Sequence, residues 1–188
     1  MATDTKELMA GAMRELMATK PVDKITIKDI VEKCGVNRQT FYYHFEDADD
    51  LLEWIFEEDA GRVLPTEVSY DRWEEDVMKF FRYLVENRTF ALNVYNSNSR
   101  LYMLRFYSQK LEKCVRDFAE IVSEGKNISR QDFDFVVSFY TEGIVGLISR
   151  WLDYNMELPK TVTFERFIQL LCDSVENMLS RFEIDSRT

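Results

Sequence analysis

Glycine and proline are scarce in this sequence, which has six glycines and three prolines among 188 residues. Both residue types mark tight turns, so their scarcity argues against an all-β sandwich and favours long helices. Hydrophobic residues nevertheless make up 46% of the chain and aromatic residues 14%. A disordered chain contains far fewer of both, so we expect a folded protein with a substantial apolar core.

Cysteine and histidine are also rare. The three cysteines, Cys34, Cys114 and Cys172, are odd in number and widely spaced, which argues against a disulfide framework and against a zinc site built from paired cysteines. His44 is the only histidine, and no Ser-His-Asp or two-histidine arrangement stands out. We therefore predict that the protein is not an enzyme and that it uses no metal and no cofactor.

Long uninterrupted apolar runs are missing as well. The most apolar segment, residues 133–152, carries Asp134, Glu142 and Arg150, and so many charges are unusual in a membrane-spanning helix. The first residues show no basic region followed by an apolar one, so no secretory signal is predicted. We expect a cytoplasmic protein that does not enter a membrane.

Acidic residues outnumber basic ones by 34 to 24, and the net charge of −10 argues at first against a nucleic-acid-binding protein. The charge is unevenly spread. Residues 20–45 contain five bases (Lys20, Lys24, Lys28, Lys33, Arg38) and three acids (Asp23, Asp29, Glu32). Residues 46–59 contain eight acids and no base. Residues 20–45 are therefore locally basic, with the sign of charge that attracts DNA.

Apolar residues recur every three or four positions along most of the chain, which is the spacing of one face of an α-helix. The first such helix has Leu8, Ala12 and Leu16 on its apolar face and ends near Ala18. Longer helices are predicted further along the chain at residues 49–64, 71–87, 100–123, 131–154 and 164–182. The fold is therefore expected to be all-α.

Two short helices are predicted between the first helix and residue 49. The segment Lys-Ile-Thr-Ile-Lys alternates like a strand, but Thr26 followed by Asp29 is a capping-box pattern, so we predict a helix here. Gly35 suits the left-handed turn that ends this helix. Asn37 suits the cap of the next helix, which is expected at residues 38–44.

Three helices with a glycine turn before the third form a helix-turn-helix pattern. In such a motif the third helix enters the major groove of DNA, and the helix before it crosses the DNA backbone. On the third helix, Phe41 and Phe45 are four residues apart and are expected to be buried together. The other side of this helix then faces outward.

The outward side carries side chains that can contact bases. Arg38 can donate a pair of hydrogen bonds to guanine, and Gln39 can pair with adenine. Thr40 and Tyr43 can contact thymine methyl groups or phosphates. Thr26 and Asn37 stand at helix starts, which can present backbone N–H groups to phosphates. Lys28, a basic residue of the same stretch, completes the set of candidate DNA-binding residues.

A more specific pattern spans residues 26–45. It has a glycine at position 35 and ends in Thr-x-Tyr-x-His-Phe at residues 40–45. In both features it resembles the DNA-binding signature of the TetR family of transcriptional regulators. Residues 139–151, Phe-Tyr-Thr-Glu-Gly-Ile-Val-Gly-Leu-Ile-Ser-Arg-Trp, are similar to one branch of that family, the dihydroxyacetone kinase operon activators.

The resemblance implies a helix-turn-helix DNA-binding domain at residues 1–47 and a larger helical domain for ligand sensing and dimerisation at residues 48–188. It implies a homodimer on a near-palindromic operator of double-stranded DNA, responsive to a small-molecule effector. By position it assigns phosphate contacts to Thr26, Tyr42 and His44, and base contacts to Arg38, Gln39, Thr40 and Tyr43.

One stretch departs from the family pattern. Family members often have a lysine at the start of the fourth helix that contacts a phosphate, whereas residues 46–50 here read Glu-Asp-Ala-Asp-Asp. Acids suit the positive end of a helix but repel DNA. We therefore expect weak, strongly salt-sensitive DNA binding, or help from a protein co-regulator. The alternative function is a coactivator-type or adaptor module of the same fold, which acts through a protein partner with weak or no DNA binding of its own.

Aromatic residues of the larger domain can line a ligand pocket or belong to the core, and the sequence leaves both readings open. The candidate pocket residues are Phe80, Tyr83, Tyr95, Tyr102, Phe106, Phe139 and Tyr140.

Two glycines, Gly143 and Gly146, lie inside a predicted helix, where each costs about 1 kcal/mol relative to alanine. Close approach of another helix would offset that cost. We therefore predict that the last two helices pair across a two-fold axis as a four-helix bundle, with tight packing inside one chain as the alternative. The candidate interface residues are Gly143, Gly146, Leu147, Trp151, Leu171, Val175 and Met178.

Overall fold

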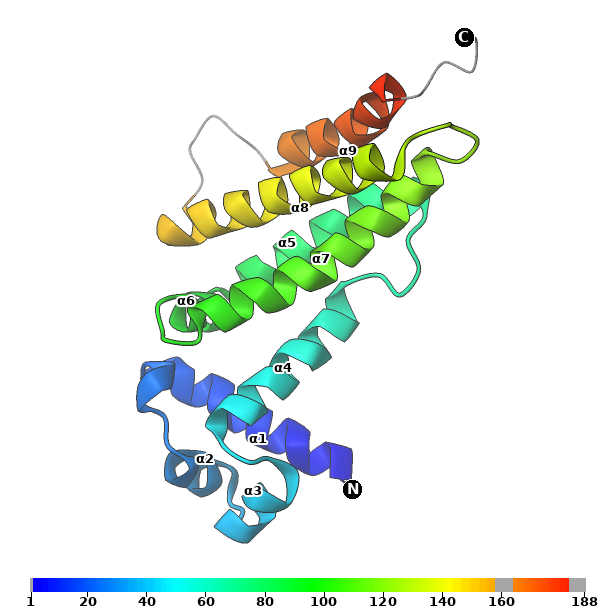
Figure 1. Ribbon diagram of the computed structural model, residues 1–188. Coiled ribbons are helices and arrows are strands. Elements are labelled where there is room, and N and C mark those ends of the chain that lie inside the picture. Colours follow the sequence, from blue (N-terminus) through cyan, green and yellow to red (C-terminus); the bar gives the residue numbers. More distant parts are fainter. Residues whose placement is uncertain (1, 158–163, 183–188) are drawn as a thin grey trace. The chain divides into compact units, whose positions relative to one another are not determined.

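Figure 1 shows a computed structural model of the protein, which describes residues 2–157 and 164–182 and leaves out the side chains at 2–4, 164–168, 171 and 172. The described residues form helices joined by turns and short loops, so the predicted all-α fold is confirmed. The chain divides into an N-terminal unit, Met1–Arg62 with Asn87–Met103, and a C-terminal unit, Val63–Glu86 with Leu104–Thr188. This division differs from the predicted boundary after residue 47.

The N-terminal unit contains four helices from the start of the chain: α1 (Ala2–Met17), α2 (Ile27–Cys34), α3 (Arg38–His44) and nearly all of α4 (Ala48–Val63). A short 3-10 helix, η1 (Val22–Lys24), joins α1 to α2. The unit also includes α6 (Arg88–Tyr95) and the first residues of α7 (Arg100–Val122). The helices that were predicted end within two residues of the observed ends, whereas α6 was not predicted.

The core of the N-terminal unit lies where α1, α2, α3, α4 and α6 meet. It contains fully buried side chains from each of them: Met9, Met13, Met17, Ile30, Phe41, Leu51, Leu52, Ile55, Phe56 and Val94. One partly buried ion pair joins two helices of this core, because the half-buried Arg14 on α1 pairs with the buried Asp59 on α4. The Arg14 guanidinium also lies 4.4 Å from the ring centroid of Phe90 on α6. Three helices are thus held at one point.

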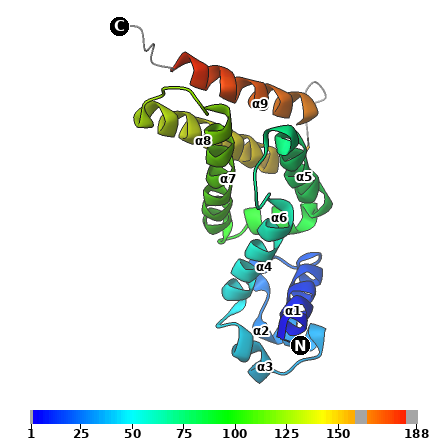
Figure 2. The same ribbon diagram turned by 90° about the vertical axis from the view of Figure 1, so that its right-hand side faces the viewer.

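The C-terminal unit consists of η2 (Tyr70–Arg72), α5 (Trp73–Glu86), most of α7, α8 (Arg130–Asp153) and α9 (Phe164–Arg181). Figures 1 and 2 show α9 lying alongside α5 and α8. In the core the rings of Trp73 and Phe118 stack with centroids 4.5 Å apart. None of the described helices is long and apolar enough to cross a membrane.

Candidate nucleic-acid interface

Two buried rings hold α3 against the rest of the N-terminal unit. Phe41 is fully buried, and Phe45, which follows the last residue of α3, is 3% exposed. Their ring centroids are 5.8 Å apart, and the Phe45 ring also meets the ring of Trp54 on α4 at 6.0 Å. Because both rings point to the same side, they fix which side of the helix faces inward. The predicted burial of this pair is confirmed.

The opposite side of α3 is open to solvent. Tyr43 is 82% exposed and Tyr42 is 58% exposed, and Arg38 and Gln39 are exposed beside them. Two large aromatic side chains, a guanidinium and an amide thus share the outer surface of a seven-residue helix. Their hydrogen-bond donors can pair with acceptors on base edges and phosphates, and their apolar parts can contact thymine methyl groups. Of the other predicted residues on α3, Thr40 and His44 are half-buried.

Asn37 caps α3, as predicted. Its Oδ1 atom accepts a hydrogen bond from the backbone nitrogen of Thr40 at 2.8 Å and from the Thr40 hydroxyl at 3.0 Å. The cap satisfies a backbone N–H that the helix itself cannot pair. It also engages the Thr40 hydroxyl proton, so Thr40 offers DNA its methyl group and oxygen lone pairs rather than a proton.

The predicted capping box at the start of α2 is present. The Thr26 hydroxyl oxygen accepts a hydrogen bond from the backbone nitrogen of Asp29 at 3.2 Å. Asp29 Oδ2 in turn accepts from the Thr26 backbone nitrogen and from the Thr26 hydroxyl, both at 2.7 Å. Both hydrogen-bond donors of Thr26 are thus engaged by Asp29 in the DNA-free chain, and its predicted phosphate contact stays a prediction.

Lys20 strengthens the same arrangement. Its Nζ atom lies 2.6 Å from Asp29 Oδ2. The hydrogen bond from Lys20, together with those from Thr26, holds the pKa of Asp29 well below its ordinary value of 3.8. Gly35 then ends α2 in the left-handed conformation, with φ of 72°. The turn that precedes α3 is thus set by local side-chain and backbone geometry.

The bases of the basic stretch are partly compensated by acids. Lys33 on α2 pairs with Glu15 on α1 at 2.6 Å, and Lys28 lies 3.6 Å from Glu32. Both pairs are largely exposed, so each contributes little to stability and either lysine can turn towards a phosphate.

The acids at the start of α4 act as caps. Asp47 Oδ1 accepts a hydrogen bond from the backbone nitrogen of Asp50 at 2.9 Å, and Asp50 Oδ2 accepts from the backbone nitrogen of Glu46 at 2.8 Å. Carboxylates at a helix N-terminus are stabilised by its unpaired N–H groups and by the helix dipole. This gives a structural reason for acids where we expected a phosphate-binding lysine.

Two sequence patterns from known families match this chain. Residues 9–55 match the pattern described as bacterial regulatory proteins, tetR family. Residues 71–173, more than half of the chain, match the pattern described as transcriptional regulator C-terminal region. The chain belongs to the TetR family. The resemblance seen in residues 26–45 is thereby confirmed, and the protein is a transcriptional regulator of that family.

A similar curated protein is the HTH-type dhaKLM operon transcriptional activator DhaS of Lactococcus lactis subsp. lactis (strain IL1403), which is 30% identical over 115 residues. The match spans 60% of this chain and 62% of that relative. The solved structure of a dihydroxyacetone kinase operon activator DhaS shares the fold, with a TM-score of 0.71, 22% identity and coverage of 96% of this chain and 98% of that one. A TetR transcriptional regulator from Streptococcus agalactiae 2603V has a TM-score of 0.62, 19% identity and coverage of 95% and 94%.

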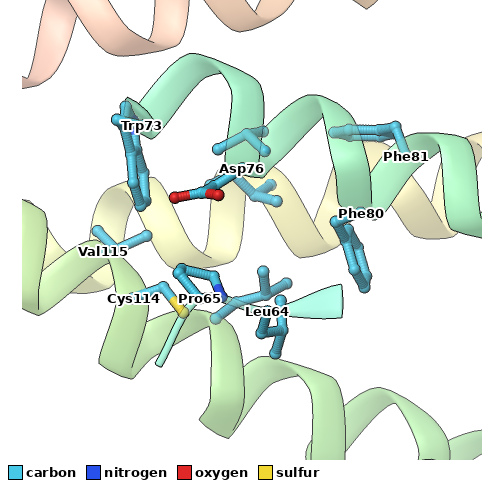
Figure 3. Close-up of a pocket in the computed structure, with 11 residues that line it drawn as sticks. Leu64, Pro65, Trp73, Asp76, Phe80, Phe81, Cys114 and Val115 are labelled. Carbon is cyan, nitrogen blue, oxygen red and sulfur yellow. The ribbon is translucent and has the colours of Figure 1, made fainter. Parts of the chain in front are cut away.

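The TetR-family chain has a small cavity inside its C-terminal unit (Figure 3). Its volume is about 20 Å³, and its walls come from α5, α7, α8 and the Leu64–Pro65 segment. Of the seven predicted pocket residues, Phe80 lines this cavity. Asp76 and Cys114 also line it and were missed by sequence reasoning. The signal for Asp76 was an acid placed between Trp73 and Phe80 on the apolar stripe of α5.

The other predicted pocket residues are not brought together here. Tyr95 and Tyr102 belong to the N-terminal unit, where Tyr95 lies under the guanidinium of Arg100 and Tyr102 stacks on Phe56. Phe139 is exposed on α8. Three further residues belong to the C-terminal unit without lining this cavity: Tyr83, Phe106 and Tyr140. This cavity therefore includes only Phe80 of the predicted set, and the pocket formed by the other residues stays a prediction.

The two glycines of α8 lie on its exposed face. A Cβ atom built at Gly143 or at Gly146 would meet nothing within 4 Å, so tight packing inside the described part of the chain does not explain them. Leu147 is also exposed on this helix. Nearby, Phe135 and Phe139 are each 54% exposed, with stacked rings 6.4 Å apart. We call these five residues the α8 face.

Two residues leave the predicted interface set. Trp151 and Val175 are buried within the chain, so neither can contact a second copy without local rearrangement. Met178 is half-buried, and the side chain of Leu171 lies outside the described residues. Periodicity placed all of them on apolar stripes but did not separate the stripe that faces the chain's own core from the stripe that faces outward.

Proposed function

We propose that this TetR-family regulator binds specific operator DNA as a homodimer and that an effector controls its binding. The observation that carries the proposal is the orientation of α3, which buries Phe41 and Phe45 and exposes Arg38, Gln39 and Tyr43. A helix that is anchored on one side and polar on the other fits a major groove. Such regulators act on chromosomal DNA, so we place the protein in the cytoplasm.

Each exposed residue of α3 has a proposed role. Arg38 reads guanine through paired donors, and Gln39 reads adenine. Tyr43 contacts a thymine methyl group or a phosphate, and the methyl group of Thr40 lies against a base edge. Phosphate contacts come from the remaining members of the set, Lys28, Asn37, Tyr42 and His44.

The homodimer is supported by the α8 face. Glycines lower the stability of a helix, and a row of apolar side chains is unfavourable in contact with water. Both features together indicate a surface that another protein surface covers. We propose that a second copy covers it, with α8 of each chain crossing near Gly143 and Gly146. The dimer then presents two α3 helices to successive major grooves, roughly 34 to 36 Å apart or somewhat more.

Effector control is proposed to act through α4. This helix leaves the core of the N-terminal unit and ends at Val63, where the C-terminal unit begins. A change in the C-terminal unit therefore reaches the DNA-binding helices through a continuous helix. The effector is a small molecule or a protein co-regulator. Equal spacing of the two α3 helices with and without effector would contradict this mechanism.

A second candidate function is favoured by the acids at the start of α4. Glu46, Asp47 and Asp49 are exposed and repel phosphates at the edge of the proposed interface. In this alternative the protein is an adaptor that acts through a protein partner and has weak or no DNA binding of its own.

Selection of bound DNA from a random-sequence pool tests the two functions against each other. The first function predicts recovery of two related half-sites in near-palindromic order, with a guanine and an adenine at neighbouring positions of each half. Recovered DNA without sequence preference at low salt, from protein that is folded and dimeric, would contradict it and favour the adaptor.

A further inference from the structure

The cavity of the C-terminal unit contains one charged group in otherwise largely apolar surroundings. Figure 3 shows the carboxylate of Asp76 turned into the cavity, beside Trp73 and Val115. Among the residues that line it, Asp76 is the only one with a formal charge, and the walls are mostly aromatic and aliphatic side chains. No lysine or arginine belongs to this lining.

One oxygen of this carboxylate lacks a partner. Asp76 is half-buried as a residue, but its Oδ2 atom is shut off from solvent and has no hydrogen-bond partner within the described chain. Cys114, the other polar residue of the lining, adds no charge, because burial raises the pKa of its thiol to about 11 and keeps it protonated. A buried carboxylate oxygen without a hydrogen bond is unfavourable, so a positively charged hydrogen-bond donor placed at Oδ2 would stabilise the site.

The size and the lining of the cavity indicate which chemical group could serve as the hydrogen-bond donor to Asp76. A volume of about 20 Å³ accommodates a single water-sized group, and an ammonium head is of that size. A hydroxyl head would also fit but would leave the negative charge uncompensated. The rings of Trp73, Phe80 and Phe81 favour a cation over a neutral group, and the aliphatic walls favour an alkyl chain behind it.

We propose that this cavity binds a small primary alkylammonium ion, whose head group donates a hydrogen bond to Asp76 Oδ2. The inference rests on the proposed effector-controlled function and names the chemistry of its ligand. Leu64 and Pro65 line the cavity and directly follow the last residue of α4. An alkyl chain behind the head group needs space that these two residues occupy, so binding displaces the segment that continues α4.

Binding is tested on the full-length protein without DNA, by calorimetry and by the NMR signal of the Trp73 indole. The probes are n-propylammonium chloride and n-propanol, which differ in the head group, with sodium chloride as the control for ionic strength. The proposal predicts saturable binding of the amine, at least about tenfold tighter than the alcohol, and a shift of the Trp73 signal. Equal or no binding of both probes to the wild-type protein overturns the proposal without the need for a variant.

Asp76→Asn keeps the shape of the side chain and removes its charge. The proposal predicts that this variant loses the preference for the amine, whereas Glu75→Gln, an exposed neighbour on α5, retains it. An Asp76→Asn protein that binds the amine as tightly as the wild type would show that the amine does not bind through the charge of Asp76, which overturns the proposal. Specific DNA binding is measured on the same samples to separate this inference from the proposed function. DNA binding without amine binding overturns the inference alone. Amine binding without DNA binding overturns the proposed function alone.

Discussion

The side-chain oxygen of Asn93 accepts a hydrogen bond from the backbone nitrogen of Val22 at 2.7 Å, although 71 residues separate them. The side-chain nitrogen of Asn93 donates to the backbone oxygens of Met17 at 2.8 Å and Lys20 at 2.9 Å. One amide on α6 thus satisfies backbone groups that the end of α1 leaves unpaired. Residues 87–103 lie in sequence between two segments of the C-terminal unit. Asn93 therefore ties α1 to a second part of the chain, besides α4, that continues into the C-terminal unit.

Replacement of Asn93 by alanine removes three hydrogen bonds and leaves their backbone partners half-buried. We expect the free energy of unfolding to fall by about 2 to 4 kcal/mol, measured by urea denaturation. Asn96→Ala is the matched control, because Asn96 on the same segment makes one exposed hydrogen bond to Leu92. A loss at Asn93 no larger than that of the control would show that the three bonds do not hold α6 to α1.

Stability should depend on pH through Asp29. Its pKa is lowered in the folded protein, chiefly by Lys20 and then by Thr26, so the stabilisation is complete above the ordinary value of 3.8 and is lost as the pH falls towards the lower folded-state value. Asp29→Asn should therefore be less stable than the wild type at neutral pH, and the difference should shrink below about pH 4. Urea denaturation at both pH values measures this. Glu32→Gln, which alters an exposed pair with Lys28, serves as the control and should change stability little.

Arg38→Ala should weaken binding to the selected operator by about 1 to 3 kcal/mol and relax the preference at one base of each half-site. The side chain is exposed, so the melting temperature should stay the same. Fluorescence anisotropy on the selected DNA and on single-base variants measures both effects. Arg72→Ala, an exposed arginine of the C-terminal unit, is the control, and an equal loss there would argue that only general charge is involved.

Ala48→Lys places a positive charge at the first residue of α4. If a phosphate contact is missing there, this variant should bind DNA more tightly and steepen the dependence of log affinity on log salt by about one unit. Ala48→Met adds comparable length without charge and should leave both quantities unchanged. Identical salt dependence of the lysine and methionine variants would mean that no phosphate comes near this position.

Gly143→Leu tests the α8 face. In the single chain a side chain here meets nothing within 4 Å, so the fold should persist and the helix should gain up to about 1 kcal/mol. In a dimer that packs through this glycine, the new side chain forces the two helices apart, so sedimentation should show monomers. Gly61→Leu on α4, where the added Cβ also meets nothing within 4 Å, should leave the oligomeric state unchanged. A dimer that survives Gly143→Leu would place its interface elsewhere.

Local features of α2 and α3 were predictable because they depend on near neighbours in sequence. The Thr26–Asp29 capping box, the left-handed Gly35 and the Asn37 cap each involve residues no more than four positions apart. Helical spacing likewise put Phe41 and Phe45 on one side of α3. The predicted surface of Arg38, Gln39 and Tyr43 followed from these local rules.

Features that join distant segments were not predictable. The helix α6 follows α5 after Asn87, which makes no side-chain cap, so the sequence shows no clear break between the two helices. The apolar stripes of α8 and α9 also do not indicate which residues pack inside the chain and which face outward. For that reason Trp151 and Val175, which are buried in the chain, were included in the predicted interface.

The sequence by itself determined α2 and α3 and the turn between them, because turns, caps and helix faces are set by interactions within a few residues. Only the tertiary structure decided that Asn93 closes the end of α1 and that Asp76 faces an apolar cavity. These relationships depend on how helices pack, and packing is a property of side chains brought together from distant parts of the chain.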